Sequence, residues 1–288
     1  MLDVAVLGWA RVGADDVEER HLATFGKGFR RIGSYVKLAQ VGAQSCLASV
    51  PGARLKGARI GVFMGSGLGN TEVSVPLAEG ILHAEKPWCS PMAFAGSVGN
   101  AAAFYVARSL ELMGPNLTVS QEELSFEAAL LEGVLALAEG TVDLALVGGV
   151  DVRETAREEE HRARLDAVGV AGEPAAGAGW VLLGLPNEPG GVRLDEVWLG
   201  AADTGDLLAG VPEGTTVLPG WRLEGLVGER IAAVETRLCA VAAAIRLVEV
   251  LDGAEAVALG EDGVKRVAHI HRTARGTGAR VRLSIPAA

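Results

Sequence analysis

The most informative stretch of the sequence is Gly114-Pro-Asn-Leu-Thr-Val-Ser-Gln-Glu-Glu-Leu-Ser-Phe-Glu-Ala128. Residues 117–119 form a short run of β-prone side chains. Ser120, with Glu123 three residues later, matches a capping box, in which the serine accepts a hydrogen bond from a helix amide and the glutamate reaches back. Apolar residues then recur at helical spacing as far as Gly140, a suitable residue after a helix end. The stretch therefore predicts a strand that runs directly into a helix over 121–139.

Strands and helices alternate on both sides of this junction. The run at 142–147 is apolar apart from Asp143, which is typical of a strand covered by helices on both faces of a parallel sheet. Such alternation predicts an α/β fold. The pattern predicts further strands at 4–8, 59–65, 178–184, 192–200 and 256–260, helices at 34–49, 97–112 and 226–251, and a terminal hairpin with arms at 269–272 and 281–285.

A boundary between two halves is predicted at Gly172-Glu-Pro174. A highly charged segment at 153–165 precedes it, and an apolar strand follows. We therefore expect an N-terminal half over 1–171 and a C-terminal half over 172–288, both rich in strand–helix–strand units. The glycine-rich segment Gly65-Ser-Gly-Leu-Gly-Asn70 lacks the Gly-Lys-Ser/Thr ending of a phosphate-binding loop, so we interpret it as a tight turn after a strand.

The composition is that of a globular protein. Hydrophobic residues make up 49% of the 288 residues, and 39 glycines are spread along the chain, so the chain can bury a sizeable core. No apolar run reaches the length that spans a membrane, and no secretory signal is evident, so we expect no membrane partner and take the cytoplasm as the default location. The net charge of −10 argues against nucleic acid as a partner.

Metal and disulfide motifs are not evident. The three cysteines, Cys46, Cys89 and Cys239, are far apart and odd in number, so they indicate neither a disulfide framework nor a metal motif. His269 and His271 stand two apart and would share one face of a strand, but two ligands alone are too few for a metal site. We therefore expect no metal and no cofactor.

Several segments resemble β-ketoacyl synthases of the thiolase-like superfamily in their order and spacing. The resemblance implies a thiolase-like fold, with two halves in a layered α-β-α-β-α arrangement that is shortened here, because the chain is smaller than a standard ketosynthase. The segments are Arg59-Ile-Gly-Val-Phe-Met-Gly-Ser-Gly-Leu-Gly69, Ser90-Pro-Met-Ala-Phe94, Ser97-Val-Gly-Asn-Ala-Ala-Ala103, the stretch from Gly114, Asp143-Leu-Ala-Leu-Val-Gly-Gly-Val-Asp151 and Gly172-Glu-Pro-Ala-Ala-Gly-Ala-Gly-Trp-Val-Leu-Leu183.

The catalytic residues of that family have no counterparts here. By register from Gly114, its nucleophilic cysteine corresponds to Glu123; its first histidine has no equivalent near 201–206, and its second corresponds to Glu229. A cysteine at a helix start is activated by the helix dipole, whereas a glutamate stays ionised and is a poor nucleophile toward a thioester. We interpret Glu123 as a helix cap, with a catalytic carboxylate as the alternative. The candidate pocket residues are Gln121, Glu122, Ser125, Phe126 and Glu229.

The favoured interpretation is a non-catalytic ketosynthase-like subunit, similar to the chain-length factors that pair with an active ketosynthase in polyketide or fatty-acid-like pathways. One alternative is a decarboxylase or acyl-processing enzyme with Glu123 as base, because a buried carboxylate with a raised pKa suits that role. Another is an acyl-chain binding protein that keeps only the pocket. An acyl carrier protein would be an indirect partner, because an acidic surface attracts an acidic carrier only through a local basic patch. The candidate patch is Lys27, Arg30, Arg31 and Lys37, which a solvated helix face explains equally well.

The resemblance also implies a dimer. In the family, the strand before the nucleophile position pairs across the two-fold axis of the dimer, and a strand edge completed by a partner removes an aggregation hazard. We expect a heterodimer with a catalytic ketosynthase, with a homodimer as the alternative. The interface residues would include Leu117, Thr118, Val119 and Ser120.

Overall fold

A computed structural model describes residues 3–27, 32–85, 88–153, 163, 173–186, 191–220, 231–232, 237–238, 241–254, 257–260, 262–273 and 275–287. The strands are β1 (Val4–Gly13), β2 (Ile60–Gly65), β3 (Asn116–Val119), β4 (Leu144–Asp151), β5 (Glu173–Pro174), β6 (Gly177–Gly184), β7 (Arg193–Ala201), β8 (Thr216–Pro219), β9 (Arg237–Leu238), β10 (Val264–Arg272) and β11 (Thr277–Pro286). The helices are α1 (Val17–Phe25), α2 (Ser34–Ala48), α3 (Gly52–Leu55), α4 (Thr71–His83), α5 (Pro91–Ser97), α6 (Ala101–Ser109), the 3₁₀ turn η1 (Glu122–Leu124), α7 (Ser125–Ala138), α9 (Thr204–Ala209) and α10 (Ala242–Leu251).

Nine strands form one mixed sheet in the order β3-β2-β4-β6-β1-β7-β11-β10-β8, and β5 pairs separately with β9. Followed outward from the centre, the order is the same twice, as β1-β6-β4-β2 and as β7-β11-β10-β8. The strand directions repeat as well, because β2 with β4 and β8 with β10 are parallel pairs, while the other ladders of the two series are antiparallel. The sheet thus contains one arrangement twice.

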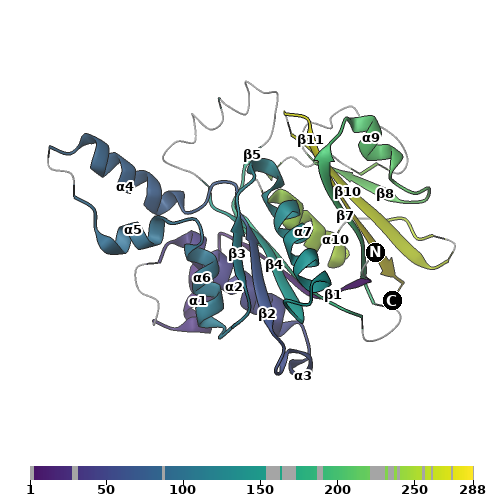
Figure 1. The fold of residues 1–288 in the computed structure, drawn as a ribbon, viewed down its shortest axis with the longest axis horizontal. Coiled ribbons are helices and arrows are strands. Elements are labelled where there is room, and N and C mark those ends of the chain that lie inside the picture. Colours follow the sequence, from purple (N-terminus) through teal and green to yellow (C-terminus); the bar gives the residue numbers. More distant parts are fainter. Residues whose placement is uncertain are drawn as a thin grey trace.

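Helices cover both faces of each half of the sheet (Figure 1). α2 and α6 pack on the outer face of the first half, over Leu146 and Trp180. α7 packs on the opposite face through Phe126, together with α10. α10 reaches the second half through Val250, which packs with β8 and β10, and α9 covers the far face of that half with Leu207. These layers confirm the predicted thiolase-like α-β-α-β-α arrangement.

The two halves of the sheet meet at a short joint. β1 pairs with β7 at two positions only, Val4 with Leu194 and Ala5 with Arg193. Beyond this joint, α7 and α10 lie between the two halves and contribute to the same core. A side chain of α7 that points between the two halves can therefore contact side chains from both.

The strands β4 and β6 are buried along their whole length. In β4, Ala145 and Val147 contribute to the core on the α7 side, whereas Leu144 and Leu146 contribute to the core on the α2 side. This alternation follows from the two-residue period of a strand. The apolar run at 142–147 is therefore covered on both faces, as predicted.

In the second half, the local sequence periodicity predicts two elements incorrectly. The helix predicted over 226–251 is too long, because α10 begins at Ala242, Ile231 makes a parallel bridge with Val217, and 237–238 form β9. The strand predicted at 256–260 is wrong too, since the described residues there make only an isolated bridge from Leu259 to Lys265. Pairing with distant strands thus prevailed over local propensity.

β6 lies between β4 and β1 in the sheet. The strand order therefore groups β6 with the elements that precede it, although the boundary predicted between 1–171 and 172–288 would assign it to the second half. The position of a domain boundary stays a prediction, and the sheet order favours a division after Gly184.

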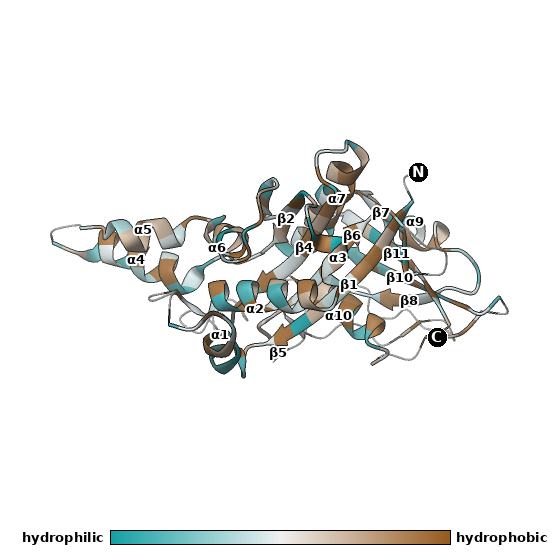
Figure 2. Ribbon diagram, turned by 90° about the horizontal axis from the view of Figure 1, so that it is seen from below, coloured by the Kyte–Doolittle hydropathy of each residue, from teal (hydrophilic) through white to brown (hydrophobic). Residues whose placement is uncertain are grey.

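α4 and α5 form an arm that projects from the sheet and its covering helices in both views (Figures 1 and 2). Neither helix contains a buried residue. Large apolar side chains of the arm face solvent, and Leu82, Met92 and Phe94 are 75%, 62% and 60% exposed. Exposed apolar side chains gathered in one region are typical of a protein interaction surface.

Candidate functional site

The junction between β3 and α7 contains the 3₁₀ turn η1. The hydroxyl of Ser125 accepts a hydrogen bond from the amide of Gln121 at 2.9 Å and donates one to the carbonyl of Glu122 at 2.7 Å. No side-chain cap bond forms at the start of η1 or of α7. The capping box predicted from Ser120 and Glu123 is therefore wrong. Glu122 adopts a left-handed backbone conformation, with φ of 50°. An α-helix cannot continue through such a residue, so α7 begins only after η1, at Ser125.

Glu122→Gly is expected to give a more stable protein than Glu122→Ala, by about 1 kcal/mol, because only glycine adopts a left-handed conformation without steric cost. Both substitutions remove the exposed ion pair of Glu122 with Arg275, so the comparison isolates the backbone. Urea unfolding followed by circular dichroism measures the difference. Glu132, an exposed residue of α7, is the control, and there alanine should be the more stable. Equal stabilities of Glu122→Gly and Glu122→Ala would contradict a steric cost of the left-handed conformation at this position.

A pocket of about 350 Å³ opens beside η1. Its walls come from the turn after β2, from the β3–α7 junction and from the hairpin between β10 and β11. Gln121 and Glu122 line it, whereas Ser125 and Phe126 are buried and do not. Glu123 is half-buried in η1, and Glu229 lies outside the described residues, so a binding or catalytic role for the predicted pocket residues stays a prediction. The lining residues are Gly67, Ser120, Gln121, Glu122, Leu124, Thr273, Arg275 and Thr277.

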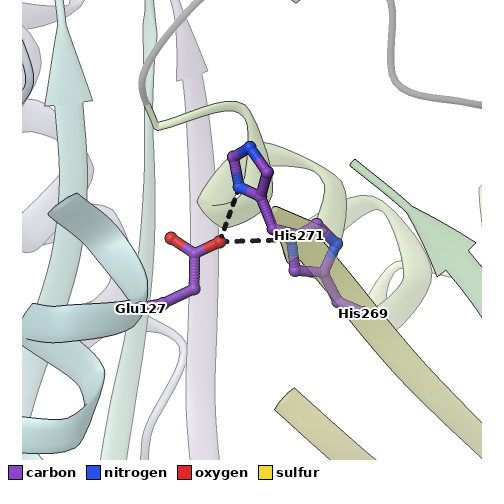
Figure 3. Close-up of side chains that lie close together, drawn as sticks. All are labelled: Glu127, His269 and His271. Atoms are coloured by element: carbon purple, nitrogen blue, oxygen red, sulfur yellow. Dashed lines mark hydrogen bonds and ion pairs between the residues drawn. The ribbon is translucent and has the colours of Figure 1, made fainter. Parts of the chain in front are cut away.

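One turn of α7 beyond Glu123, a second glutamate meets both histidines of β10 (Figure 3). Glu127 Oε1 lies 3.2 Å from His269 Nε2 and 3.1 Å from His271 Nδ1. Glu127 is fully buried, and the histidines are 4% and 5% exposed. The two rings share one strand face, as predicted, because they stand two residues apart. The cluster joins a helix of the first half to a strand of the second.

The histidines determine the charge state of Glu127. Burial raises the pKa of this carboxyl, but the hydrogen bonds from His269 and His271 and the charges on these rings lower it more, to about 2. Glu127 is therefore a carboxylate at neutral pH, although no water reaches it. A buried carboxylate bound by two imidazoles is a structural unit that can hold a proton or a cation between its members.

Glu127 is not among the site residues predicted from the sequence. The histidine spacing pointed to a shared strand face, but the third member stands 142 residues away in sequence. The available signal was the four-residue spacing from Glu123 to Glu127, which places both side chains on one side of a helix. Nothing local indicated that this helix side faces β10, because that contact depends on how the two halves of the sheet meet.

A second buried carboxylate lies at the end of β4. Asp151 accepts hydrogen bonds from the hydroxyl of Ser66 at 2.6 Å and from the amides of Gly67 and Leu68 at 3.2 and 3.1 Å. Burial raises the pKa of Asp151 to about 6, against the opposing effect of these hydrogen bonds. The glycine-rich segment after β2 thus uses its amides to hold a carboxylate of the protein itself, in agreement with its interpretation as a turn.

The free energy of unfolding is expected to fall by roughly 1 to 1.5 kcal/mol between pH 5 and pH 7.5 because of Asp151. Its folded pKa, about 6, exceeds the unfolded value, so the folded state binds the proton more tightly. The resulting stabilisation is complete below the unfolded pKa and disappears as pH rises through 6. Urea unfolding across this range should show the fall. Asp151→Asn should remove it, whereas Asp143→Asn, at an exposed position, should keep it; an unchanged slope in Asp151→Asn would contradict the prediction.

Glu127, His269 and His271 are also the one potential metal-binding cluster among the described residues. Their ligand atoms all lie within 4.8 Å of one another. Cys46 is buried and Cys89 is partly exposed, and both are free thiols, whereas Cys239 lies outside the described residues. Glu127 thus places a third potential ligand atom beside the histidine pair, and the expectation of no metal stays a prediction.

The predicted interface strand lies at an open edge. β3 is the first strand of the sheet order, and among the described strands β2 is its single neighbour. Leu117 is 39% exposed, Ser120 is exposed, and Thr118 and Val119 are partly buried. An open strand edge of this kind is suited to pairing with another chain, but a role in a dimer stays a prediction. No helix in the described part of the chain has the length and apolar character needed to cross a membrane.

The duplicated sheet order, the five layers and the strand–turn–helix junction define a protein of the thiolase-like fold class. A family model described as β-ketoacyl synthase, N-terminal domain, matches residues 11–173, which is more than half of the 288 residues. The chain therefore belongs to the β-ketoacyl synthase family, and the resemblance found in the sequence is confirmed. No curated protein matches the sequence significantly.

Solved structures agree on the fold. The structure titled as the ishigamide ketosynthase/chain length factor superposes with a TM-score of 0.74 at 16% identity, covering 99% of both chains. A type II polyketide synthase acyl-carrier protein in complex with its ketosynthase gives 0.72 at 13% identity, covering 99% of this chain and 100% of that one. An oxazolomycin ketosynthase domain from Streptomyces albus gives 0.66 at 15% identity, covering 99% and 76%. At these identities the likeness establishes the fold alone.

Proposed function

We propose that this chain is a non-catalytic ketosynthase-like subunit that pairs with an active β-ketoacyl synthase in a polyketide or fatty-acid-like pathway, as chain-length factors do. Glu123 carries the proposal: it lies in η1, and by the sequence register from Gly114 it corresponds to the family's nucleophilic cysteine. An ionised carboxylate is a poor nucleophile toward a thioester, so the chain lacks the group that would accept an acyl chain. A subunit of this kind needs a partner that supplies the nucleophile.

The surface around β3 supports the need for a partner. The open edge of β3 lies in the same part of the molecule as α6 and the projecting arm (Figure 1). Phe104 on α6 is 51% exposed and Met113, in the loop before β3, is 95% exposed. The arm adds the exposed apolar side chains of α4 and α5, and in Figure 2 its ribbon carries hydrophobic segments between paler and hydrophilic ones. Obligate interfaces are rich in apolar groups of this kind and bury well over roughly 2,000 Å².

The heterodimer is favoured over the homodimer by the absence of a nucleophile, since two copies of this chain would still lack one. The structure titled as a ketosynthase/chain length factor has the same fold, which supports a paired arrangement without establishing one here. Contact with an acyl carrier protein would be indirect, through the catalytic partner, because the net charge of this chain is −10 and such carriers are acidic too.

Co-expression with ketosynthases encoded beside this gene tests the proposal. A complex with a cysteine-containing ketosynthase should elute as one species in size-exclusion chromatography. When the complex is incubated with an acylated carrier protein, intact-mass analysis should find the acyl group on the partner and not on this chain. An acyl adduct on this chain, or a stable monomer that binds no ketosynthase, would contradict the proposal.

Two alternatives share one observation, the pocket beside η1. A decarboxylase or acyl-processing enzyme would use Glu123 as base and hold its substrate in this pocket, which the neighbouring Glu122 and Leu124 line but Glu123 does not. An acyl-chain binding protein would use the same pocket without chemistry. Glu123→Gln separates the enzyme from the other two candidates, because it should abolish turnover by an enzyme while leaving the assembly of a partner subunit and the binding of an acyl chain intact. Activity of the isolated wild-type chain that Glu123→Gln removes would favour the enzyme.

A further inference from the structure

We propose that Glu127, His269 and His271 bind a divalent transition-metal ion of the zinc class between the two halves of the sheet. The proposal is independent of the pairing with a ketosynthase. It rests on the chemistry of the three side chains, on how their ligand atoms converge and on one buried carboxylate oxygen that the hydrogen bonds leave without a partner.

The ligand set fits such a metal. Two imidazoles and one carboxylate are a ligand set that proteins use for Zn²⁺ with bond lengths near 2.0–2.2 Å, and imidazole also suits the neighbouring divalent transition metals. Glu127 Oε1 lies 3.2 and 3.1 Å from the facing nitrogens of His269 and His271, close to the separation of two atoms bound to one zinc ion. All three ligand atoms lie within 4.8 Å of one another, and Figure 3 shows that the carboxylate points toward both rings.

Hydrogen bonds alone leave one of the two carboxylate oxygens unexplained. Both histidines contact the same oxygen, Oε1, whereas Oε2 of Glu127 is buried and has no hydrogen-bond partner in the described part of the chain. A buried carboxylate oxygen without a partner costs free energy. A cation seated between the three residues would be available to both oxygens and would remove this cost. Nδ1 of His269 also lacks a hydrogen-bond partner among the described residues. A metal bound at Nε2 would leave Nδ1 as it is, so this atom does not distinguish a metal-bound cluster from a metal-free one.

The surroundings hold the ligands in place. Glu127 lies on α7, between the two halves of the sheet, and both histidines lie on β10 in the second half. The ring of His271 packs on the backbone at Gly220, where an added Cβ would come within 3.0 Å of its Cγ. All three ligands are buried, so the metal would have a structural role, as a clamp that joins α7 to β10.

Zinc binding by the full chain tests the proposal. The protein, stripped of metal with a chelator, is dialysed against Zn²⁺, and is also refolded from urea with and without Zn²⁺, so that burial cannot prevent loading. Elemental analysis should find one equivalent of zinc, and the bound ion should raise the unfolding temperature. Glu127→Gln, His269→Asn and His271→Asn should each weaken binding at least tenfold, while His83→Asn, at an exposed position on α4, should bind as the wild type does.

Cobalt identifies the ligand directly. His271→Cys should still bind Co²⁺ and should add a thiolate-to-cobalt charge-transfer band that the wild type lacks, which a merely structural histidine would not produce. The proposal is overturned if the folded wild type, dialysed or refolded with Zn²⁺, holds no zinc. It is equally overturned if binding persists in Glu127→Gln and His269→Asn, or if Co²⁺ in His271→Cys gives no thiolate band.

Discussion

Thr118→Lys is expected to abolish the assembly of this chain with its partner. Thr118 lies in the edge strand β3, paired on one side with Met64 of β2. Its hydroxyl oxygen is buried without a hydrogen-bond partner among the described residues, although the strand itself is open on its other side. In the proposed complex, a lysine here would place an unpaired charge in the contact, at a cost of about 3 kcal/mol or more, which corresponds to roughly a hundredfold or greater loss of affinity.

Co-purification with the ketosynthase partner, followed by size-exclusion chromatography, measures this effect. Thr118→Val has nearly the same shape without charge and should leave assembly intact. Thr24→Lys adds the same charge at an exposed position of α1 and should also assemble. If Thr118→Lys assembles as well as these two controls, β3 does not lie in the interface, and the partner-subunit proposal loses its geometric support.

Glu127→Ala is expected to lower the free energy of unfolding by about 3 to 5 kcal/mol. The substitution removes the acceptor of two buried histidine nitrogens and leaves a cavity between α7 and β10, and the loss of one member of a buried ionic cluster typically costs this much. Because Glu127 is fully buried, solvent cannot replace it. Urea unfolding in chelator-containing buffer measures the loss without any contribution from a bound metal.

Glu132→Ala is the matched control, because Glu132 lies on the same helix but is exposed. It should change stability by less than about 0.5 kcal/mol. A change below about 1 kcal/mol for Glu127→Ala would show that the cluster does not hold the two halves together.

The sequence predicts the first half of this fold better than the second. The strands at 59–65 and 142–147 are predicted as apolar runs, and the scarcity of polar residues in the second predicts its burial on both faces. The start of α7 could not be predicted, because Ser120 and Glu123 match a capping box perfectly well as sequence. The left-handed turn at Glu122 decides otherwise, and such a turn in a non-glycine residue has no reliable sequence signal.

The candidate site shows the same division. The register from Gly114 predicts that Glu123 corresponds to the family's cysteine. The two-residue spacing predicts that His269 and His271 share one strand face. Their meeting with Glu127 depends on how the second half of the sheet packs across α7, which is a tertiary property. The predicted counterpart of the second family histidine, Glu229, lies outside the described residues, so its place relative to this cluster stays a prediction.

The position of β1 at the centre of the sheet has a consequence for biosynthesis. β1 (Val4–Gly13) leaves the ribosome well before its two neighbours in the sheet, β6 and β7, which begin beyond residue 176. At roughly 5–20 residues per second, β1 waits on the order of ten to thirty seconds for its partners. During that time an apolar segment with open backbone edges is available to chaperones and to other nascent chains, and its late, long-range pairing makes folding slow. Expression yield should therefore respond more to chaperone supply and to translation speed than the stability of the finished protein would suggest.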